Sequence, residues 1–218
     1  MIEGGEADPM KRIRISHCLP VLLLALAGCS QTPPAKKEPP KPPEPATGQS
    51  AIFQTYQVAR TWAPDARLLK LESGSIPEAP ASGGKYGFWR ATYVSESKRS
   101  RREFTWAAAD SEGGIIKGVR AGADSGYLPN PRIFPMAIQE VKIDTPKALE
   151  AAMAEVEKDS NMKKVLADNP DLPVHFLLEW VAPDVKPTWR VIFGPSVSQS
   201  KFSVFVDAFT GRFVRKLR

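Results

Sequence analysis

The sequence predicts an α+β fold with two similar units, and three observations support this. Segments with apolar residues at helical spacing are followed by short runs typical of β-strands, and this order occurs twice. A proline-rich stretch precedes both copies, and an apolar, basic-flanked stretch precedes that. We therefore divide the chain into a leader (1–28), a linker (29–50) and two units (51–125 and 126–218).

The leader has the three regions of a secretory signal. The basic cluster Lys11-Arg12-Ile13-Arg14 precedes the apolar run Leu19–Ala27, and small residues follow. The run is too short to cross a bilayer, which takes ~20 apolar residues. Met10 begins such a signal directly, so it is an alternative start to Met1.

The end of the leader, Leu26-Ala27-Gly28-Cys29, resembles a bacterial lipobox. The resemblance implies cleavage before Cys29, acylation of Cys29, and a membrane contact through this lipid anchor. Ser30 after the Cys implies the outer membrane of a bacterial cell envelope, facing the periplasm. The alternative is an ordinary secretory signal that contains a Cys.

Composition restricts the chemistry of the folded part. Cys18 and His17 lie in the leader, and Cys29 is the expected lipid site, so His175 is the one remaining side chain of these two types. It stands in a strand-like run. Catalytic schemes and metal sites built from His or Cys therefore lack their parts, although paired carboxylates stay open. We predict no enzyme, no metal and no cofactor. For an exported chain, a net charge of +6 does not indicate nucleic acid as the partner.

The linker cannot form a core. Residues 30–50 hold seven prolines among Lys and Glu residues, and they lack large apolar side chains. Proline favours extended polyproline geometry, which would span roughly 65 Å at most. We interpret the segment as a spacer above the membrane; the alternative is a proline-rich ligand for another protein.

The first unit is predicted to start with a helix. Apolar residues recur at helical spacing in Ala51–Trp62, and Pro64 ends the helix. Loops are expected at 73–84 and 122–135, which are rich in Pro, Gly or Ser. The predicted strands are Ala66–Leu71, Phe88–Val94, Phe104–Ala109 and Ile115–Val119.

The second unit starts with the clearest helix, Thr145–Lys158. Asp144 or Thr145 can serve as its N-cap, and Pro146 suits its first turn. A second helix is predicted at Asn161–Ala167. The predicted strands are Val174–Val181, Trp189–Phe193, Lys201–Val206 and Phe213–Leu217.

Matching segments indicate an internal duplication. Trp89–Tyr93 parallels Trp189–Phe193, and Phe104–Ala109 parallels Phe202–Asp207. In this alignment Gly113 falls opposite Gly211, and Ile115-Ile116 falls opposite Phe213-Val214.

The second copy resembles the PepSY domain, whose strands end in a V-D-A-x-T-G turn. The residues that carry the resemblance are Trp189–Phe193 and then Phe202–Gly211, within a match over 143–218. In the first copy Ala109 replaces the Asp and Glu112 replaces the Thr, so that unit is degenerate. The resemblance implies two PepSY-like units, each a helix packed on an antiparallel sheet. Such domains occur in protease propeptides and bacterial envelope proteins, and restraint of peptidases was proposed for them.

Asp207 and Gly211 are interpreted as turn residues rather than catalysts. The Asp207 carboxylate can accept backbone N–H bonds and close an Asx turn. Gly211 can adopt a positive φ, which a tight hairpin needs.

Lys98, Arg99, Arg101 and Arg102 form the densest basic cluster of the chain. We interpret it as a contact for an anionic partner, either lipid or protein. The alternative is a solvated hairpin tip.

Together these features predict a non-catalytic envelope lipoprotein. We expect a binding module for an unknown envelope protein or peptide, with restraint of a peptidase as one form of this role and an exposed sheet edge as the contact. The alternative is a structural or assembly lipoprotein of the envelope.

Overall fold

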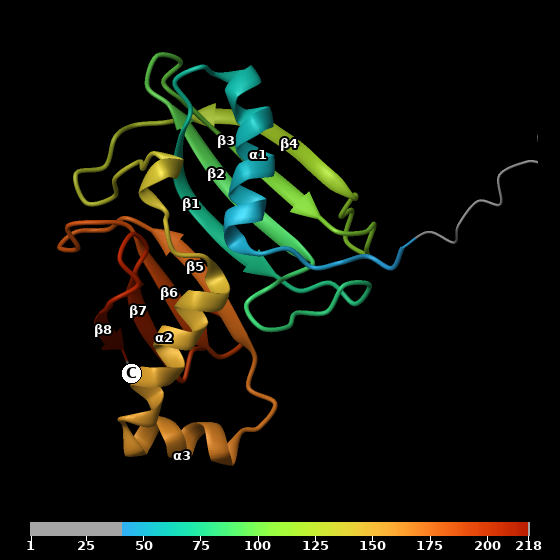
Figure 1. The fold of residues 1–218 in the computed structure, drawn as a ribbon. Helices are drawn as coiled ribbons and strands as arrows, with labels where there is room; N and C mark the ends of the chain where they lie inside the picture. The colour runs from blue at the N-terminus through green and yellow to red at the C-terminus, as the bar shows by residue number, and fades with distance from the viewer. Residues whose placement is uncertain (1–40, 218) are drawn as a thin grey trace, which may run out of the picture. The chain divides into compact units, whose positions relative to one another are not determined.

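The computed structural model describes residues 41–217, which belong to one compact unit. The predicted signal, Cys29 and the linker up to residue 40 lie outside the described residues. Eight strands form one antiparallel sheet in the order β4-β3-β2-β1-β5-β6-β7-β8. The fold is therefore α+β (Figure 1).

Each half consists of a helical segment followed by a four-stranded meander. The first half comprises α1 (Gly48–Trp62), β1 (Arg67–Gly74), β2 (Phe88–Ser95), β3 (Ser100–Ala107) and β4 (Gly118–Gly126). The second comprises the short helix η1 (Ile138–Glu140), α2 (Thr145–Glu157), α3 (Ser160–Asp168), β5 (Val174–Glu179), β6 (Thr188–Phe193), β7 (Phe202–Asp207) and β8 (Phe213–Leu217).

The two halves share one sheet, where the sequence suggested one sheet for each. Strands β1 and β5, the first of each meander, pair through Leu71 and Leu178, which are both fully buried. A strand at a sheet edge leaves a row of N–H and C=O groups unpaired. Pairing β1 with β5 satisfies part of each row, through three residue pairs, and joins the halves.

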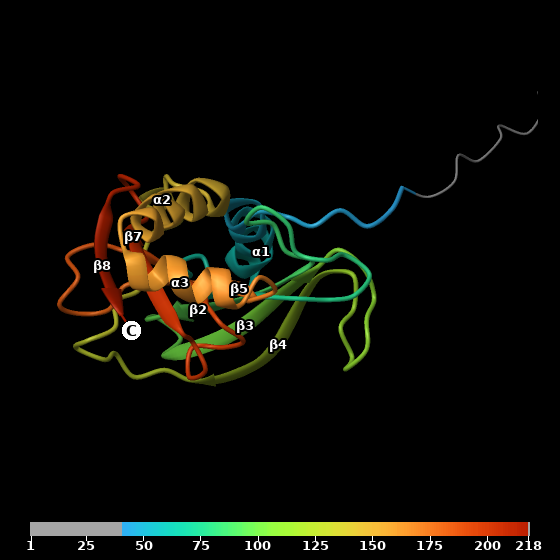
Figure 2. The ribbon, with the colours of Figure 1, turned by 90° about the horizontal axis from the view of Figure 1, so that it is seen from below.

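Helices α1 and α2 cover one face of the sheet (Figure 2). Trp89 in β2 and Trp189 in β6 are fully buried beneath them. The indole N–H of Trp89 donates to the carbonyl of Ala46 at 2.9 Å, and that of Trp189 donates to the carbonyl of Ile143 at 2.7 Å. Both acceptors lie two residues before a helix, so the two halves repeat this contact.

The N-termini of α1 and α2 meet. The Gly48 N–H donates to Thr145 Oγ1 at 3.0 Å. Oδ1 of Asp144 accepts from the N–H groups of both Gln49, at 2.9 Å, and Thr145, at 2.8 Å. Two helix N-termini carry like partial positive charges. The Asp144 carboxylate lies between them and stabilises both.

The strand register corrects the alignment of the repeat by two residues. Trp89 pairs with Trp106, and Trp189 pairs with Val206, so Trp106 corresponds to Val206. A two-residue shift keeps every side chain on its face, so alternation could not reveal it. It follows that Ala107, and not Ala109, corresponds to Asp207.

The glycine turns of the two halves also differ. Val119 pairs with Trp106, whereas Phe213 pairs with Val206, so Val119 corresponds to Phe213. The turn of the first half is therefore longer, and Gly113 does not lie opposite Gly211. Residues 115–116, which were aligned with Phe213-Val214, belong to this longer turn.

Several element boundaries differ from the prediction; β1, for example, runs to Gly74, past the predicted end at Leu71. β4 extends to Gly126, beyond the predicted end at Val119. The prediction stopped early because the small and glycine residues of this strand give no alternating pattern. α1 starts at Gly48, inside the predicted linker, where Thr47 is the N-cap. β3 starts at Ser100 and so includes Arg101 and Arg102, which were expected in a turn.

Candidate functional site

A long segment, 127–137, crosses the end of the sheet at which β1 begins and β5 ends. It is the loop that leads from β4 toward α2 in Figure 1. Main-chain bonds hold it on both sides: Leu68 and Met136 exchange two bonds of 3.0 and 2.7 Å, and the Phe134 N–H donates to the Trp180 carbonyl at 2.9 Å. The segment is therefore fixed between the two halves.

This segment forms one side of a groove. A cavity of about 530 Å³ continues into a second of about 350 Å³, and both are bordered by Glu96, Tyr127 and Pro129. We call the two together the aromatic groove. Its lining residues are Arg67, Glu96, Arg99, Tyr127, Leu128, Pro129, Asn130, Pro131, Ile133, Phe134, Pro135 and Trp180.

The walls of the groove are mostly apolar and held in place. The rings of Phe134 and Trp180 lie 5.3 Å apart, and the Trp180 indole N–H donates to the Asp184 carbonyl at 3.0 Å. Tyr127 is 8% exposed, whereas the neighbouring Leu128 is 86% exposed. Such a fixed surface, with one free apolar side chain, suits an extended apolar segment.

The polar groups of the groove are few. Burial raises the pKa of Tyr127; the Glu96 carboxylate adds to this, and the Arg67 guanidinium opposes it. The charges of Glu96 and Arg67 therefore have opposite effects on the pKa of Tyr127. With Arg99 on the rim, the groove carries two arginines and one glutamate.

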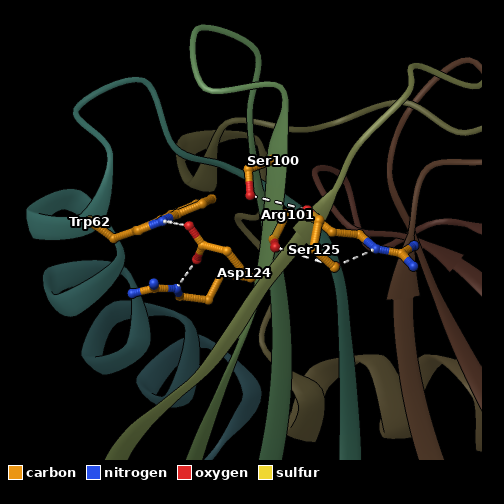
Figure 3. Close-up of polar contacts among 6 residues, drawn as sticks. Trp62, Ser100, Arg101, Asp124 and Ser125 are labelled. Atoms are coloured by element: carbon orange, nitrogen blue, oxygen red, sulfur yellow. Dashed lines mark hydrogen bonds and ion pairs between the residues drawn. The ribbon is translucent and has the colours of Figure 1, made fainter.

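The structure divides the predicted basic cluster between the two faces of the sheet (Figure 3). Arg102 pairs with Asp124 on the helix face, and the Trp62 indole N–H donates to the same carboxylate at 3.1 Å. The Arg102 guanidinium and the Lys98 ammonium lie 5.4 and 5.6 Å from the Trp62 ring centre. These contacts join the end of α1 to β4.

The carboxylate of Asp124 is stabilised in its charged form. Burial acts to raise its pKa, but the hydrogen bonds from Trp62 and Arg102, together with the charges of Arg102 and Lys98, lower it further than burial raises it. Lys98 and Arg102 thus stabilise the Asp124 carboxylate, which joins β4 to the end of α1.

The other two basic residues have different surroundings. Arg101 Nε donates to Ser125 Oγ at 3.2 Å on the opposite face, and the Ser100 hydroxyl donates to the Ser125 carbonyl at 3.0 Å (Figure 3). Arg99 lies in the turn between β2 and β3 and borders the groove. Successive strand residues point to opposite faces, so one run of basic residues does not form one patch.

Neither Asp207 nor Gly211 lines the groove. Asp207 Oδ1 accepts the N–H groups of Phe209, at 2.8 Å, and Thr210, at 2.7 Å. Gly211 has a φ of +76°, and its N–H donates to the Asp207 carbonyl at 2.9 Å. Both residues therefore have the geometry of turn formation.

The uncovered sheet face has clefts of its own, of about 420 and 430 Å³. Its charges mostly pair with one another, as in the 3.1 Å ion pair of Arg90 with Glu103. His175 lines one cleft, and burial lowers its pKa. Burial raises the pKa of Glu179 in the other, although Arg190 and further cations oppose the rise. Neither cleft has the cluster of aromatic and proline side chains that lines the groove.

Sequence reasoning missed the groove because the prolines of 122–135 indicate a loop. Tyr127, Leu128, Ile133 and Phe134 within that loop were the available signal, since a loop between two units seldom needs four large apolar residues. Trp180 comes from a strand-like run, and only the tertiary structure brings it to them.

Membrane-spanning helices and metal-binding clusters are both absent from the described residues, 41–217. No helix there is long and apolar enough to span a bilayer. Within the same range, no three His, Cys, Asp or Glu side chains gather into a group that could hold a metal ion.

Comparison with known proteins gives one likeness of fold. No protein-family model matches the chain, and no curated protein matches it significantly. The structure is similar to the 1.85 Å crystal structure of a candidate lipoprotein from Clostridium difficile 630, with a TM-score of 0.40 and 9% identity. The match covers 77% of this chain and 91% of that one.

Proposed function

We propose that this chain is a non-catalytic lipoprotein of the bacterial envelope, and that its aromatic groove binds an extended segment of a protein or peptide. The observation that carries the proposal is the groove itself, whose apolar walls are fixed by main-chain bonds between the halves. Tyr, Trp and Arg side chains in such settings commonly dominate binding energy. Tyr127, Trp180 and Arg99 are of these types.

The groove lies at the opposite end of the sheet from the entry of the linker. Ala46 pairs with Tyr86 just before β2 begins, whereas Glu96 follows the last residue of β2. An eight-residue strand is about 26 Å long. Ala46 and the groove therefore lie at opposite ends of β2.

The sheet edges support binding less well than the groove does. Both edge pairings are irregular: the register shifts between Arg102 and Phe104 opposite β4, and between Phe205 and Val206 opposite β8. Bulges of this kind protect edges from adding another strand. We therefore place the partner in the groove, and not at an edge.

The lipid anchor is a separate part of the proposal. Metabolic labelling with a fatty acid should label the parent chain, and Cys29→Ser should abolish the label and leave an unprocessed precursor. Equal labelling of the two would refute acylation at Cys29. Membrane fractionation tests the outer membrane, and recovery solely with the inner membrane would refute that location.

The PepSY relation and peptidase restraint belong to the same proposal. They rest on the Trp189-Arg190 strand and on the turn from Asp207 to Gly211. A pull-down from detergent-solubilised membranes should recover a peptidase if restraint is the role. Recovery of an envelope scaffold instead would favour an assembly lipoprotein.

A peptide library displayed on phage tests binding in the groove. The fragment 41–218 is a suitable bait, because it contains the whole sheet and the contacts that seat α1. Leu128→Asp should abolish the binding of selected peptides, since Leu128 is 86% exposed and lines the groove. Val185→Asp is the matched control, as Val185 is 83% exposed and lies outside the groove lining. Equal loss in both variants, or no selected peptide at all, would refute the groove.

A further inference from the structure

We propose that Arg99 is the carboxylate-binding residue of the aromatic groove, so that the groove takes peptides with an acidic residue beside apolar ones. This inference rests on the proposed function, and it adds the chemical class of the partner. It depends on three observations: a strained backbone at Arg99, a guanidinium without a partner, and the charge of the groove.

The backbone of Arg99 is strained. Its φ of 49° makes it the one non-glycine residue between 41 and 217 with a positive φ. The turn is closed by the Arg99 N–H, which donates to the Glu96 carbonyl at 3.1 Å. Glycine adopts this conformation without steric cost, so an arginine here is unfavourable for the turn alone. Strain of this kind is typical of ligand-binding positions.

The Arg99 guanidinium is available to a ligand. Its three basic neighbours are engaged: Lys98 lies over the Trp62 ring, Arg101 binds Ser125 and Arg102 binds Asp124. Within 41–217, no hydrogen bond or ion pair to the Arg99 side chain is present. A guanidinium presents a planar fork of donors that matches a carboxylate in a bidentate pair.

The charge of the groove selects the same ligand. The groove has two positive charges, on Arg67 and Arg99, and one negative charge, on Glu96. The walls around Phe134 and Trp180 are apolar. An anionic membrane would meet the Arg99 cation equally well. However, a flat layer of lipid headgroups would leave the apolar walls around Phe134 and Trp180 unfilled, whereas an extended peptide can fill them. We therefore assign the groove to an acidic peptide rather than to lipid.

A double-mutant cycle tests the inference. Each peptide selected on the parent fragment 41–218 is synthesised in two versions, one with its Glu and one with Gln at that position. The affinity of both versions is then measured for the parent fragment and for the Arg99→Gly variant. The peptides should be enriched in acidic residues, and either change should weaken binding about tenfold, as one charge-assisted pair predicts. The two changes together should weaken it no further. Arg99→Gly should also raise the melting temperature, because it removes the strain.

Arg120→Ser is the control, since it removes one exposed positive charge from β4, outside the groove. It should leave affinity for the Glu peptides within twofold of the parent.

If no peptide is selected, the proposed function fails. If peptides bind at Leu128 without acidic enrichment and Arg99→Gly has no effect, the groove stands and the role of Arg99 fails. Arg99-dependent binding to vesicles of phosphatidylglycerol and phosphatidylcholine, in place of peptide, would overturn the choice of partner. A lowered melting temperature in Arg99→Gly would overturn the strain argument.

Discussion

At Gly211 the backbone conformation, and not the side-chain space alone, decides which residue is tolerated. Its φ is +76°, and an added Cβ would approach Cδ1 of Ile143 at 3.3 Å. Gly211→Val should therefore lower the free energy of unfolding by roughly 1–2 kcal/mol. Thermal melts of the fragment 41–218 measure the loss.

Gly126→Val is a matched control, because Gly126 has ordinary backbone geometry and open space around its Cβ direction. It should cost clearly less than Gly211→Val. Asp207→Ala should cost about 1 kcal/mol, since two N–H groups lose their acceptor. If Gly211→Val melts with the parent, the turn does not depend on its positive φ.

Asp65 gives the protein a defined acid sensitivity. Hydrogen bonds, first from the Ser95 hydroxyl and then from the Ser97 N–H, lower the pKa of Asp65 from 3.8 to about 2. Because the folded state holds the lower pKa, the stabilisation is fully present above about pH 4 and is lost as the pH falls through 2. The Asp65→Asn variant should not show this part of the loss of stability at low pH.

Melting temperatures from neutral pH down to pH 2 test the role of Asp65. The parent should lose stability more steeply than Asp65→Asn across the window below pH 4. Asp168→Asn, which removes an exposed ion pair with Lys164, should retain the parent's slope. Identical slopes for the parent and Asp65→Asn would contradict the assignment. Asp65 also binds the Ser97 N–H within the turn that contains Arg99, so peptide binding in the groove should weaken in the same pH range.

At the scale of elements, Asp144 stabilises the N-termini of two helices, α1 and α2. Its carboxylate accepts N–H groups from the first turns of both α1 and α2. Asp144→Ala should cost about 1–2 kcal/mol, because an N-cap and a favourable charge at two helix N-termini are lost. Asp144→Asn keeps an acceptor oxygen and should cost less.

Hydrogen exchange separates the two helices in this test. Asp144→Ala should speed exchange in the first turns of both α1 and α2. Thr47→Ala removes only the cap of α1, whose bond to the Ser50 N–H is long at 3.4 Å and exposed, so it should affect α1 alone and weakly. Exchange that changes only in α2 of the Asp144→Ala variant would show that the shared cap is not important for α1.

The elements also show what the sequence could predict. Helices with clear caps, such as α2 with Asp144 and Pro146, and strands with aromatic or β-branched runs, such as β6, were predicted within a residue or two. β4 was predicted too short because its small, mostly exposed residues give no alternating apolar pattern. The aromatic groove could not be predicted, because it depends on how segment 127–137 meets Trp180.

At the scale of the whole molecule, the sequence could suggest two similar units but not how they join. Pairing of β1 with β5 depends on two edges that each unit would otherwise expose, and no residue pattern within either strand specifies that partner. The meeting of Gly48 and Thr145 at the helix N-termini adds a second contact between the halves. The joined structure should therefore unfold as one unit.

Val204→Ala tests this cooperativity far from the shared strands. Val204 is fully buried in β7 and corresponds to Phe104 in β3, because Val204 pairs with Val191 and Phe104 pairs with Ala91. Removing two methyl groups from this core should cost about 2 kcal/mol. If the sheet unfolds as one unit, the slowest amides of β3 in the first half should lose the same protection against hydrogen exchange as those of β7.

The reciprocal variant is Phe104→Leu, which should lower the protection of β7 as much as that of β3. Two independent halves would each confine the loss to the strand that carries the substitution. That result would mean that the β1–β5 pair opens separately from the cores on either side. The aromatic groove, whose walls come from both halves at Tyr127 and Trp180, would then be disrupted before either half unfolds. One cooperative transition instead predicts that peptide binding and global unfolding are lost together in both variants.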